Sequence, residues 1–376
     1  MAKGEEPIMR LGMFTMPSHP PERPLYDALQ WDRQCLRWAD EYGYEEAWIG
    51  EHFTAPWEPV PAPDLLIAQA ALETERIKLA PGAHLLPYHH PVELAHRVAQ
   101  LDHMLQGRMI LGIGAGGLPT DWEMFGIDGA NNENRFMAAE ALEIMIRLWE
   151  ATEPFQFKGK YWNVNFDPAV QFGVLSPWLK PMQRPHPPIG IAGGLSSPSL
   201  TLEMAGERGF YPMTFALASH VVKDGWTSVE RGAERAGRQA DRSQWRVVRD
   251  VFVAETDEEA RRWSVESHMG RMQNQYFLKL LTSFGARHVL KHHPDVADDD
   301  VTPDYLARTT WLVGSPETVA ERLAEQYEDF GGFGTVLLSG YDYSEDPEPW
   351  RQSMELMATE VMPRVAHLQA PEAVSV

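Results

Sequence analysis

The second predicted strand, residues 46–53, ends in side chains that could move a proton: Glu51 and His52, followed by Phe53. The ordinary pKa of a histidine is about 6.5, so an imidazole can accept or release a proton near neutral pH. We therefore take His52 as a candidate catalytic residue. The alternative is a hydrogen-bonded histidine with a purely structural role.

His89 and His90 form a second histidine group, directly before Pro91 and a predicted helix. A zinc site needs at least a third protein ligand, and neither an HxH nor an HExxH pattern occurs in the chain. The single cysteine, Cys35, lies in the first predicted helix. One thiol can form neither an intramolecular disulfide nor a four-cysteine metal site, and we expect no bound metal.

Small residues follow the third and fourth predicted strands, in the segments 81–84 and 112–117. Where side chains are small, a planar ligand can approach the backbone closely. Gly112, Gly114 and Gly117 also satisfy G-x-G-x-x-G, but a dinucleotide site needs a helix that begins within the glycines, in the first unit of the fold. Pro119 interrupts this run, which belongs to the fourth unit. We favour a strand end that leaves room for a planar ring.

Glycines and serines follow the fifth predicted strand: Gly193, Gly194, Ser196, Ser197 and Ser199. The pattern predicts a helix start with Ser197 as the N-cap residue and Pro198 at the first helical position. Free backbone N–H groups and serine hydroxyls together could bind a phosphate. Plain helix capping is the alternative.

The elements that must position these residues form a regular alternation. Eight predicted strands, each followed by a helix, cover residues 10–15, 46–53, 77–86, 109–114, 188–192, 210–215, 245–254 and 335–339. Strands that alternate with helices indicate parallel βαβ units, and eight such units fit a closed (β/α)8 TIM barrel. We expect one barrel domain over residues 1–376, with its functional face at the carboxyl ends of the strands.

Two stretches depart from the alternation and are predicted to be inserted loops. They cover about residues 153–187, rich in proline and aromatic residues, and about 281–312, which contains an acidic run. Long loops of a barrel often form lids or substrate walls. The segment Gly314 to Glu317 is expected to be a structural helix cap.

The charge of the chain excludes several classes of partner. With 33 basic and 54 acidic side chains, the formal net charge is −21, which disfavours nucleic acid and anionic membrane surfaces. A small anionic cofactor is still compatible, because a helix N-terminus can hold a phosphate locally. The chain has neither a signal-peptide pattern nor a run of eighteen apolar residues, so we expect a cytoplasmic protein.

Together these segments resemble the bacterial luciferase-like, flavin-dependent monooxygenase family, over most of the chain. Within that family the chain is most similar to the diketocamphane monooxygenases, with limonene-type monooxygenases as near relatives. The matching stretches include 48–53 (WIGEHF), 83–91 (AHLLPYHHP), 101–104 (LDHM), 111–116 (LGIGAG), 159–162 (GKYW), 205–209 (AGERG), 312–317 (LVGSPE) and 346–350 (DPEPW).

The resemblance implies a (β/α)8 barrel that binds reduced FMN at its C-terminal face. The phosphate is expected near Ser196, Ser197 and Ser199, with Gly193 and Gly194 beside it. The isoalloxazine is expected against Ala83, His84, Gly114, Ala115 and Gly116. Family members often carry a non-proline cis peptide after the third strand, which would fall at Gly82-Ala83 or Ala83-His84.

The resemblance also implies a chemistry, in which reduced FMN and O2 react through a C4a-(hydro)peroxyflavin. The catalytic histidine of the family maps to His52, and Asp121 matches an acidic position of the family. The expected reaction is a Baeyer–Villiger oxidation of a hydrophobic cyclic ketone to a lactone. Hydroxylation or epoxidation of a terpene-like or aromatic substrate stays open. Apolar candidates for the substrate pocket are Phe53, Trp57, Trp162, Trp178 and Phe215.

Electrons for this chemistry must come from another protein, because the chain contains no convincing second nucleotide-binding module. We therefore expect a separate NAD(P)H:flavin reductase as the partner, and family analogy implies a homodimer. Two other classes stay open. One is a barrel oxidoreductase that uses a deazaflavin or NAD(P)H directly, and the other is a non-catalytic flavin-binding barrel.

Overall fold

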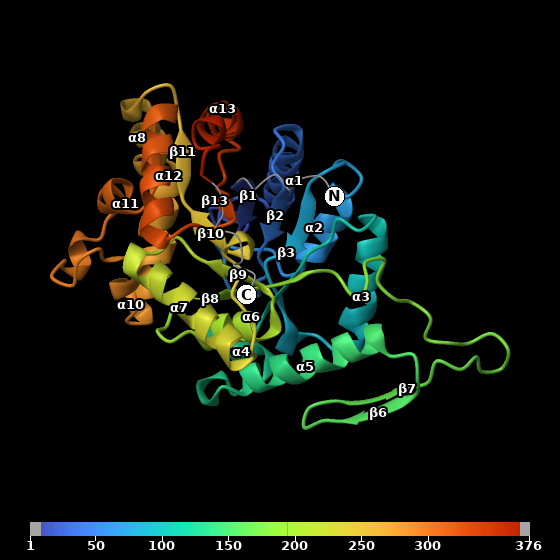
Figure 1. Ribbon diagram of the computed structural model, residues 1–376. Coiled ribbons are helices and arrows are strands. Elements are labelled where there is room, and N and C mark those ends of the chain that lie inside the picture. The colour runs from blue at the N-terminus through green and yellow to red at the C-terminus, as the bar shows by residue number, and fades with distance from the viewer. Residues whose placement is uncertain (1–8, 194, 369–376) are drawn as a thin grey trace.

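The strands of the protein form a parallel barrel in the computed structural model, which describes residues 9–193 and 195–368 (Figure 1). The barrel strands are β1 (Arg10–Thr15), β2 (Glu46–Ile49), β3 (Lys78–Pro81), β4 (His84–Leu85), β5 (Leu111–Gly114), β8 (Ile189–Gly193), β9 (Tyr211–Thr214), β10 (Arg246–Arg249) and β13 (Thr335–Ser339). They pair in the order β3-β2-β1-β13-β10-β9-β8-β5-β4. Because β3 and β4 are two parts of the third predicted strand, and a parallel bridge from Leu79 to Met109 joins β3 to the start of the fourth, the ring closes around eight strand positions. The predicted (β/α)8 barrel is confirmed.

The interior of the barrel is filled by one side chain or two from each strand. Phe14, Trp48, Met213, Val248 and Leu337 meet there, all of them buried. Trp48 is the largest of these and needs glycine neighbours: a Cβ at position 190 would lie 2.5 Å from Trp48 Cη2. The interior is therefore a packed core, and space for a ligand exists only beyond the strand ends.

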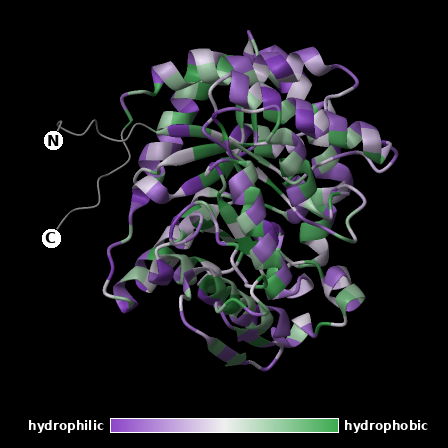
Figure 2. Ribbon diagram, turned by 90° about the vertical axis from the view of Figure 1, so that its right-hand side faces the viewer, coloured by the Kyte–Doolittle hydropathy of each residue, from purple (hydrophilic) through white to green (hydrophobic). Residues whose placement is uncertain are grey.

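Helices form the outer layer, each following a strand. They are α1 (Leu25–Glu41), α2 (Pro63–Ala70), α3 (Pro91–Met104), α4 (Pro119–Phe125), α5 (Glu133–Glu150), α6 (Leu200–Arg208), α7 (Ser219–Arg235), α12 (Pro316–Phe330) and α13 (Pro347–Leu356). In α1 the buried residues Ala28, Trp31, Cys35 and Ala39 recur at helical spacing, so one face packs on the strands. Figure 2 shows the mixture of hydrophilic and hydrophobic residues in these helices. None of the helices in the described residues combines the length and apolarity needed to cross a membrane.

The first predicted insertion, residues 153–187, contains the antiparallel hairpin of β6 (Phe155–Lys158) and β7 (Asn163–Phe166). The hairpin and the loop that follows it lie away from the barrel strands in Figure 1. We call residues 153–187 the arm.

The second predicted insertion begins earlier than residue 281. The predicted strand 245–254 divides at Asp250 into β10 and β11 (Val251–Val253), and β11 leaves the ring to pair with β12 (Leu312–Gly314). Between β11 and β12 lie α8 (Asp257–Val265), α9 (His268–Met272), a π-helical turn (Gln273–Phe277), α10 (Leu278–Ser283) and α11 (Pro303–Thr309). We call residues 268–284 the helical wall. Arg249 and Asp250 interrupt the apolar residues of this predicted strand where it divides, but the sequence does not reveal that the two halves pair with different partners.

The predicted helix cap after β12 is confirmed. Ser315 is the N-cap residue of α12, with its hydroxyl oxygen accepting a hydrogen bond from Thr318 N–H, and Pro316 occupies the first helical position. Proline fits there because the first helical N–H groups have no partner within the helix.

Candidate active site

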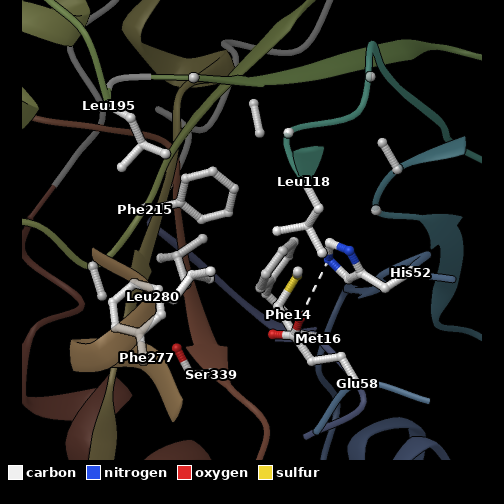
Figure 3. Close-up of a pocket in the computed structure, with 18 of the residues that line it drawn as sticks. Phe14, Met16, His52, Glu58, Leu118, Leu195, Phe215, Phe277, Leu280 and Ser339 are labelled. Atoms are coloured by element: carbon white, nitrogen blue, oxygen red, sulfur yellow. Dashed lines mark ion pairs between the residues drawn. The ribbon is translucent and has the colours of Figure 1, made fainter. Parts of the chain in front are cut away.

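A cavity of about 420 Å³ lies beyond the carboxyl ends of the strands, and its lining is largely apolar. Strand ends and the segments that follow them supply part of the lining, including Phe14, His52, Ala83, Gly114 to Leu118 and Phe215. The helical wall supplies another part through Tyr276, Phe277, Leu280 and neighbouring residues. Figure 3 shows His52 and Glu58 on one side of this space and Phe215, Leu280 and Phe277 across from them. An apolar cavity with few polar groups is typical of a site for a hydrophobic small molecule.

His52 follows β2 and lies between two carboxylates. Its Nε2 is 3.4 Å from Glu58 Oε2, and its Nδ1 is 3.8 Å from Asp121 Oδ2. Burial alone would lower the pKa of His52, but the charges of Glu58 and Asp121 outweigh burial and raise it. A histidine with a raised pKa holds its proton more tightly than a free imidazole does, and His52 lines the cavity, where it can offer that proton to an oxygen atom.

Asp121, at the start of α4, supports His52 from behind and does not line the cavity. Burial raises the pKa of Asp121, but the nearby His52 and the hydrogen bond donated by the Thr54 hydroxyl overcome this and lower the pKa below its ordinary value. The carboxylate therefore stays ionised. The structure thus brings the two predicted catalytic residues, His52 and Asp121, together.

The ends of the third and fourth strands form a surface of small residues. The Gly82-Ala83 peptide bond is cis, as the family resemblance implied, and Ala83 lines the cavity together with Gly114, Ala115 and Gly116. At position 116 the backbone has φ +79°, and a Cβ there would lie 2.3 Å from Tyr88 Oη. A side chain at this position would collide with Tyr88 and strain the backbone, so glycine is needed at this strand end.

His84 does not join that surface. It is buried, and its Nδ1 lies 2.9 Å from Glu51 Oε2, while Oε1 of the same carboxylate lies 2.7 Å from His89 Nε2. Burial raises the pKa of Glu51, but the hydrogen bonds from the two histidines prevail and lower it to about 2. The three side chains gather within the reach of a metal ion. Hydrogen bonding accounts for the cluster, since each Glu51 oxygen already has an imidazole partner.

The end of β8 and the start of α6 form a polar end of the cavity. Ser196, Ser199 and Thr201 line this part, and Arg135 of α5 lines the same cavity. A Cβ at position 193 would lie 2.4 Å from Thr201 Oγ1 and 2.7 Å from Ser199 Oγ, so glycine is needed where the hydroxyls converge. Two hydroxyls, helix N–H groups and a guanidinium are together suited to an anion.

One prediction about this helix start is wrong. The N-cap residue of α6 is Ser199, with its hydroxyl accepting from Leu202 N–H, and not Ser197. The helix begins two residues later than predicted, at Leu200, after a cis bond between Ser197 and Pro198. The side chain of Ser197 is exposed and does not line the cavity. Gly194 lies outside the described residues.

Of the five apolar residues predicted for the substrate pocket, only Phe215 lines the cavity. Phe53 packs against Tyr88 and Phe125, and Trp57 is buried behind the cavity. Trp162 and Trp178 belong to the arm, where Trp178 is 77% exposed. The arm extends away from the strand ends, so its aromatic residues lie outside the lining.

The missed residues come from the helical wall and from the loop after His52. Phe277 and Leu280 supply apolar surface, and Glu58 supplies a carboxylate. Phe277 and Leu280 stand in a mostly apolar segment, residues 276–281, which a core helix would also show. Glu58 stands alone in a proline-rich loop. Neither the apolar segment nor the single acid indicates a cavity until the fold shows where each of them lies.

A barrel with a largely apolar cavity and a few polar side chains at the strand termini is typical of enzymes that act on small molecules. The family model of the luciferase-like monooxygenases matches residues 9–332. The chain therefore belongs to this family.

Several relatives resemble the chain over nearly its whole length. The 3,6-diketocamphane 1,6-monooxygenase of Pseudomonas putida is 35% identical over 95% of this chain and 98% of its own. The limonene 1,2-monooxygenase of Rhodococcus erythropolis is 31% identical over 94% of this chain and 85% of its own. The oxygenating constituent of 3,6-diketocamphane monooxygenase, a type II Baeyer–Villiger monooxygenase solved in complex with FMN, superposes with a TM-score of 0.90, covering 97% of this chain and 100% of its own.

Proposed function

We propose that this protein is the oxygenase component of a two-component, FMN-dependent Baeyer–Villiger monooxygenase, which converts a hydrophobic cyclic ketone to a lactone. The observation that carries the proposal is an apolar cavity lined by His52, which is paired with Glu58, and also by the hydroxyl-bearing residues Ser199 and Thr201. The similarity to the diketocamphane enzymes over the whole chain supports the choice of ketone substrates.

The residues around the cavity fit FMN. Ser199, Thr201 and Arg135 would hold the phosphate, and the guanidinium would offset the repulsion from a chain of net charge −21. The small residues Ala83 and Gly116 would lie against the planar ring. When bound in its reduced form, the flavin supplies the electrons that activate O2.

The chain itself contributes water exclusion, orientation and a proton. The aromatic and aliphatic side chains of Phe215, Phe277 and Leu280 remove water from around the substrate. His52 holds a proton at Nε2 or Nδ1, with carboxylates behind both nitrogens, and offers it to the reacting oxygen. Overall, ketone, O2 and reduced FMN give lactone, water and oxidised FMN.

Isotope labelling tests this function. The protein is mixed with FMN, a flavin reductase, NADH and a bicyclic ketone under ¹⁸O2, and the product is analysed by mass spectrometry. We expect a lactone that carries one ¹⁸O atom, and none when the oxygenase is omitted. The proposal would be wrong if no ketone gave a lactone while a terpene such as limonene gave a hydroxylated or epoxidised product. That result would support the alternative favoured by the similarity to limonene 1,2-monooxygenase.

The proposal also includes a partner protein and an oligomeric state. The chain receives reduced FMN from a separate NAD(P)H:flavin reductase in the cytoplasm, and it acts as a homodimer. Photochemically reduced FMN should therefore support a single turnover without nicotinamide, and the protein alone should not oxidise NADH. Analytical ultracentrifugation should give a mass near twice 42.6 kDa.

A further inference from the structure

A buried carboxylate that has no assigned role lies directly beside His52. Glu58 is 5% exposed, and its Oε2 is 3.4 Å from His52 Nε2, the ion pair marked in Figure 3. Asp121 Oδ2 lies at the other ring nitrogen, at 3.8 Å, where neither atom has a hydrogen-bond partner within the described residues. The imidazole is thus held between two acids, and Glu58 is the one whose side chain also lines the cavity.

Backbone hydrogen bonds hold Glu58 in this position. The loop after β2 folds back on itself: His52 N–H donates to Val60 O at 3.0 Å, and Glu58 N–H donates to Ala55 O at 2.9 Å. His19 N–H, from the loop after β1, donates to Trp57 O at 2.8 Å. These bonds fix the backbone of Glu58 beside His52, while the side chain is held by the hydrogen bond from Tyr276.

Tyr276 connects the same carboxylate to the helical wall. Its hydroxyl donates to Glu58 Oε2 at 2.8 Å, and its ring stacks on Trp57 with centroids 6.3 Å apart and planes 16° apart. Tyr276 stands in the π-helical turn, a local geometry that recurs at functional sites. The wall that covers the cavity is thus fastened to the acid that faces His52.

The charged and titratable groups around His52 come from several elements. Glu51 and Glu58 come from the segment after β2, and Asp121 comes from α4. Tyr276 faces Glu58 from the helical wall, and burial together with the Glu58 charge raises the pKa of Tyr276, which keeps it a hydrogen-bond donor. Burial also raises the pKa of Glu58, although His52 and Tyr276 act in the opposite direction.

We propose that Glu58 is a positioning residue for His52: it holds the imidazole against the cavity in its protonated form, and Tyr276 makes this hold depend on the helical wall. The inference rests on the proposed function, because it concerns the same site. The inference also gives the π-helical turn a role. Through one hydrogen bond from Tyr276 to Glu58, the turn links the helical wall over the cavity to the site of His52.

Histidine titration by NMR tests this inference on the protein without FMN, so the result does not depend on the proposed reaction. The signal of His52 is assigned by its loss in His52→Gln. In Glu58→Gln the shape is kept and the charge is lost, and we expect the pKa of His52 to fall by about 1–3 pH units, as for loss of a neighbouring opposite charge. The matched control is Glu325→Gln, which removes an exposed carboxylate on α12 and should leave the titration unchanged.

Tyr276→Phe completes a double-mutant cycle. We expect the pKa of His52 to fall in this variant as well, and to fall no further when Tyr276→Phe is added to Glu58→Gln. Equal pKa values of His52 in Glu58→Gln and Glu325→Gln would overturn the role of Glu58. Additive effects would overturn the link to the wall. If Glu58→Gln does not fold, Tyr276→Phe alone tests the proposal. An unchanged pKa of His52 in Tyr276→Phe would then contradict it.

Discussion

At the scale of single residues, His52 carries the proposed proton transfer. Truncation to alanine removes the imidazole but leaves the small-residue surface and the anion-binding end untouched. We expect His52→Ala to lower kcat by about 10²- to 10⁴-fold, the usual effect of losing a general acid, with little change in the Kd for reduced FMN. Single-turnover kinetics and anaerobic flavin titration measure the two quantities. Unchanged turnover would show that another group supplies the proton.

Gly193 bears on the anion-binding end. A methyl group at this position would lie within 2.4 Å of Thr201 Oγ1 and 2.7 Å of Ser199 Oγ, and overpacking of this kind costs about 1–3 kcal/mol. We expect Gly193→Ala to weaken binding of reduced FMN about tenfold or more. Ser197→Ala is the comparison, because this side chain does not line the cavity. Equal losses in both variants would move the phosphate site toward Ser197.

At the scale of elements, a buried histidine joins three of them. His19, after β1, lies 3.1 Å from Asp32 on α1 and 2.8 Å from Asp342 after β13, and Arg23 also contacts Asp342. Burial lowers the pKa of His19, but the two carboxylates prevail and raise it to about 9. The folded state therefore binds a proton at this site more tightly than the unfolded chain does.

The sign of the resulting pH dependence is fixed by that shift. The stabilisation is fully present below about pH 6.5, the ordinary pKa of histidine, and is lost as the pH rises through about 9. We expect the free energy of unfolding to decrease over this range in the wild type. His19→Gln should be less stable at pH 6 and should lack most of this decrease. Urea unfolding at several pH values measures both, and parallel curves for the two proteins would contradict the assignment.

The elements were predictable to different degrees. Alternating apolar runs and amphipathic helices indicated eight units, because each strand of a parallel barrel is buried on both faces. The division of strand 245–254 was not predictable, since Val247 and Phe252 are equally apolar and only tertiary pairing separates β10 from β11. The start of α6 was misjudged for a local reason: Ser197-Pro198 and Ser199 offer two possible caps, and sequence pattern favours the first.

The residues of the candidate site were also predictable to different degrees. His52, Ala83 and Gly116 stand at strand ends, so a correct barrel places them near the cavity. Glu58 and Tyr276 lie 218 residues apart and meet only through the tertiary fold. Trp178 is an aromatic residue of the kind that often lines a pocket, but it belongs to the arm. The type of a side chain alone does not show whether it lines a cavity or lies on an exposed loop.

At the scale of the whole molecule, a buried ion pair spans the barrel. Arg246 of β10 donates from Nε and Nη2 to the two oxygens of Glu46 of β2, at 3.0 Å each, and both side chains are 3% exposed. The indole of Trp48 donates to the same carboxylate at 3.0 Å. The pair therefore joins two strands that are not neighbours in the ring, since β1 and β13 lie between them.

Removing one partner leaves the other charge buried. We expect Glu46→Ala to lower the free energy of unfolding by about 3–5 kcal/mol, as for other broken buried pairs. Glu325→Ala, at an exposed position, should change it by less than about 0.5 kcal/mol. Replacing both partners, Glu46→Met with Arg246→Met, should recover part of the loss. A loss in Glu46→Ala as small as that in the exposed control would mean that water reaches the guanidinium.

The ribbon of β11 and β12 separates the helical wall from the closed ring. Fifty-eight residues, 254–311, leave and rejoin the fold on one pair of adjacent strands, while the barrel ladder runs through β10 and β13 without them. Changes within this segment can therefore alter the lining of the cavity while the hydrogen bonds that close the barrel stay the same. Laboratory recombination between relatives has natural crossover points at Val253 and Leu312.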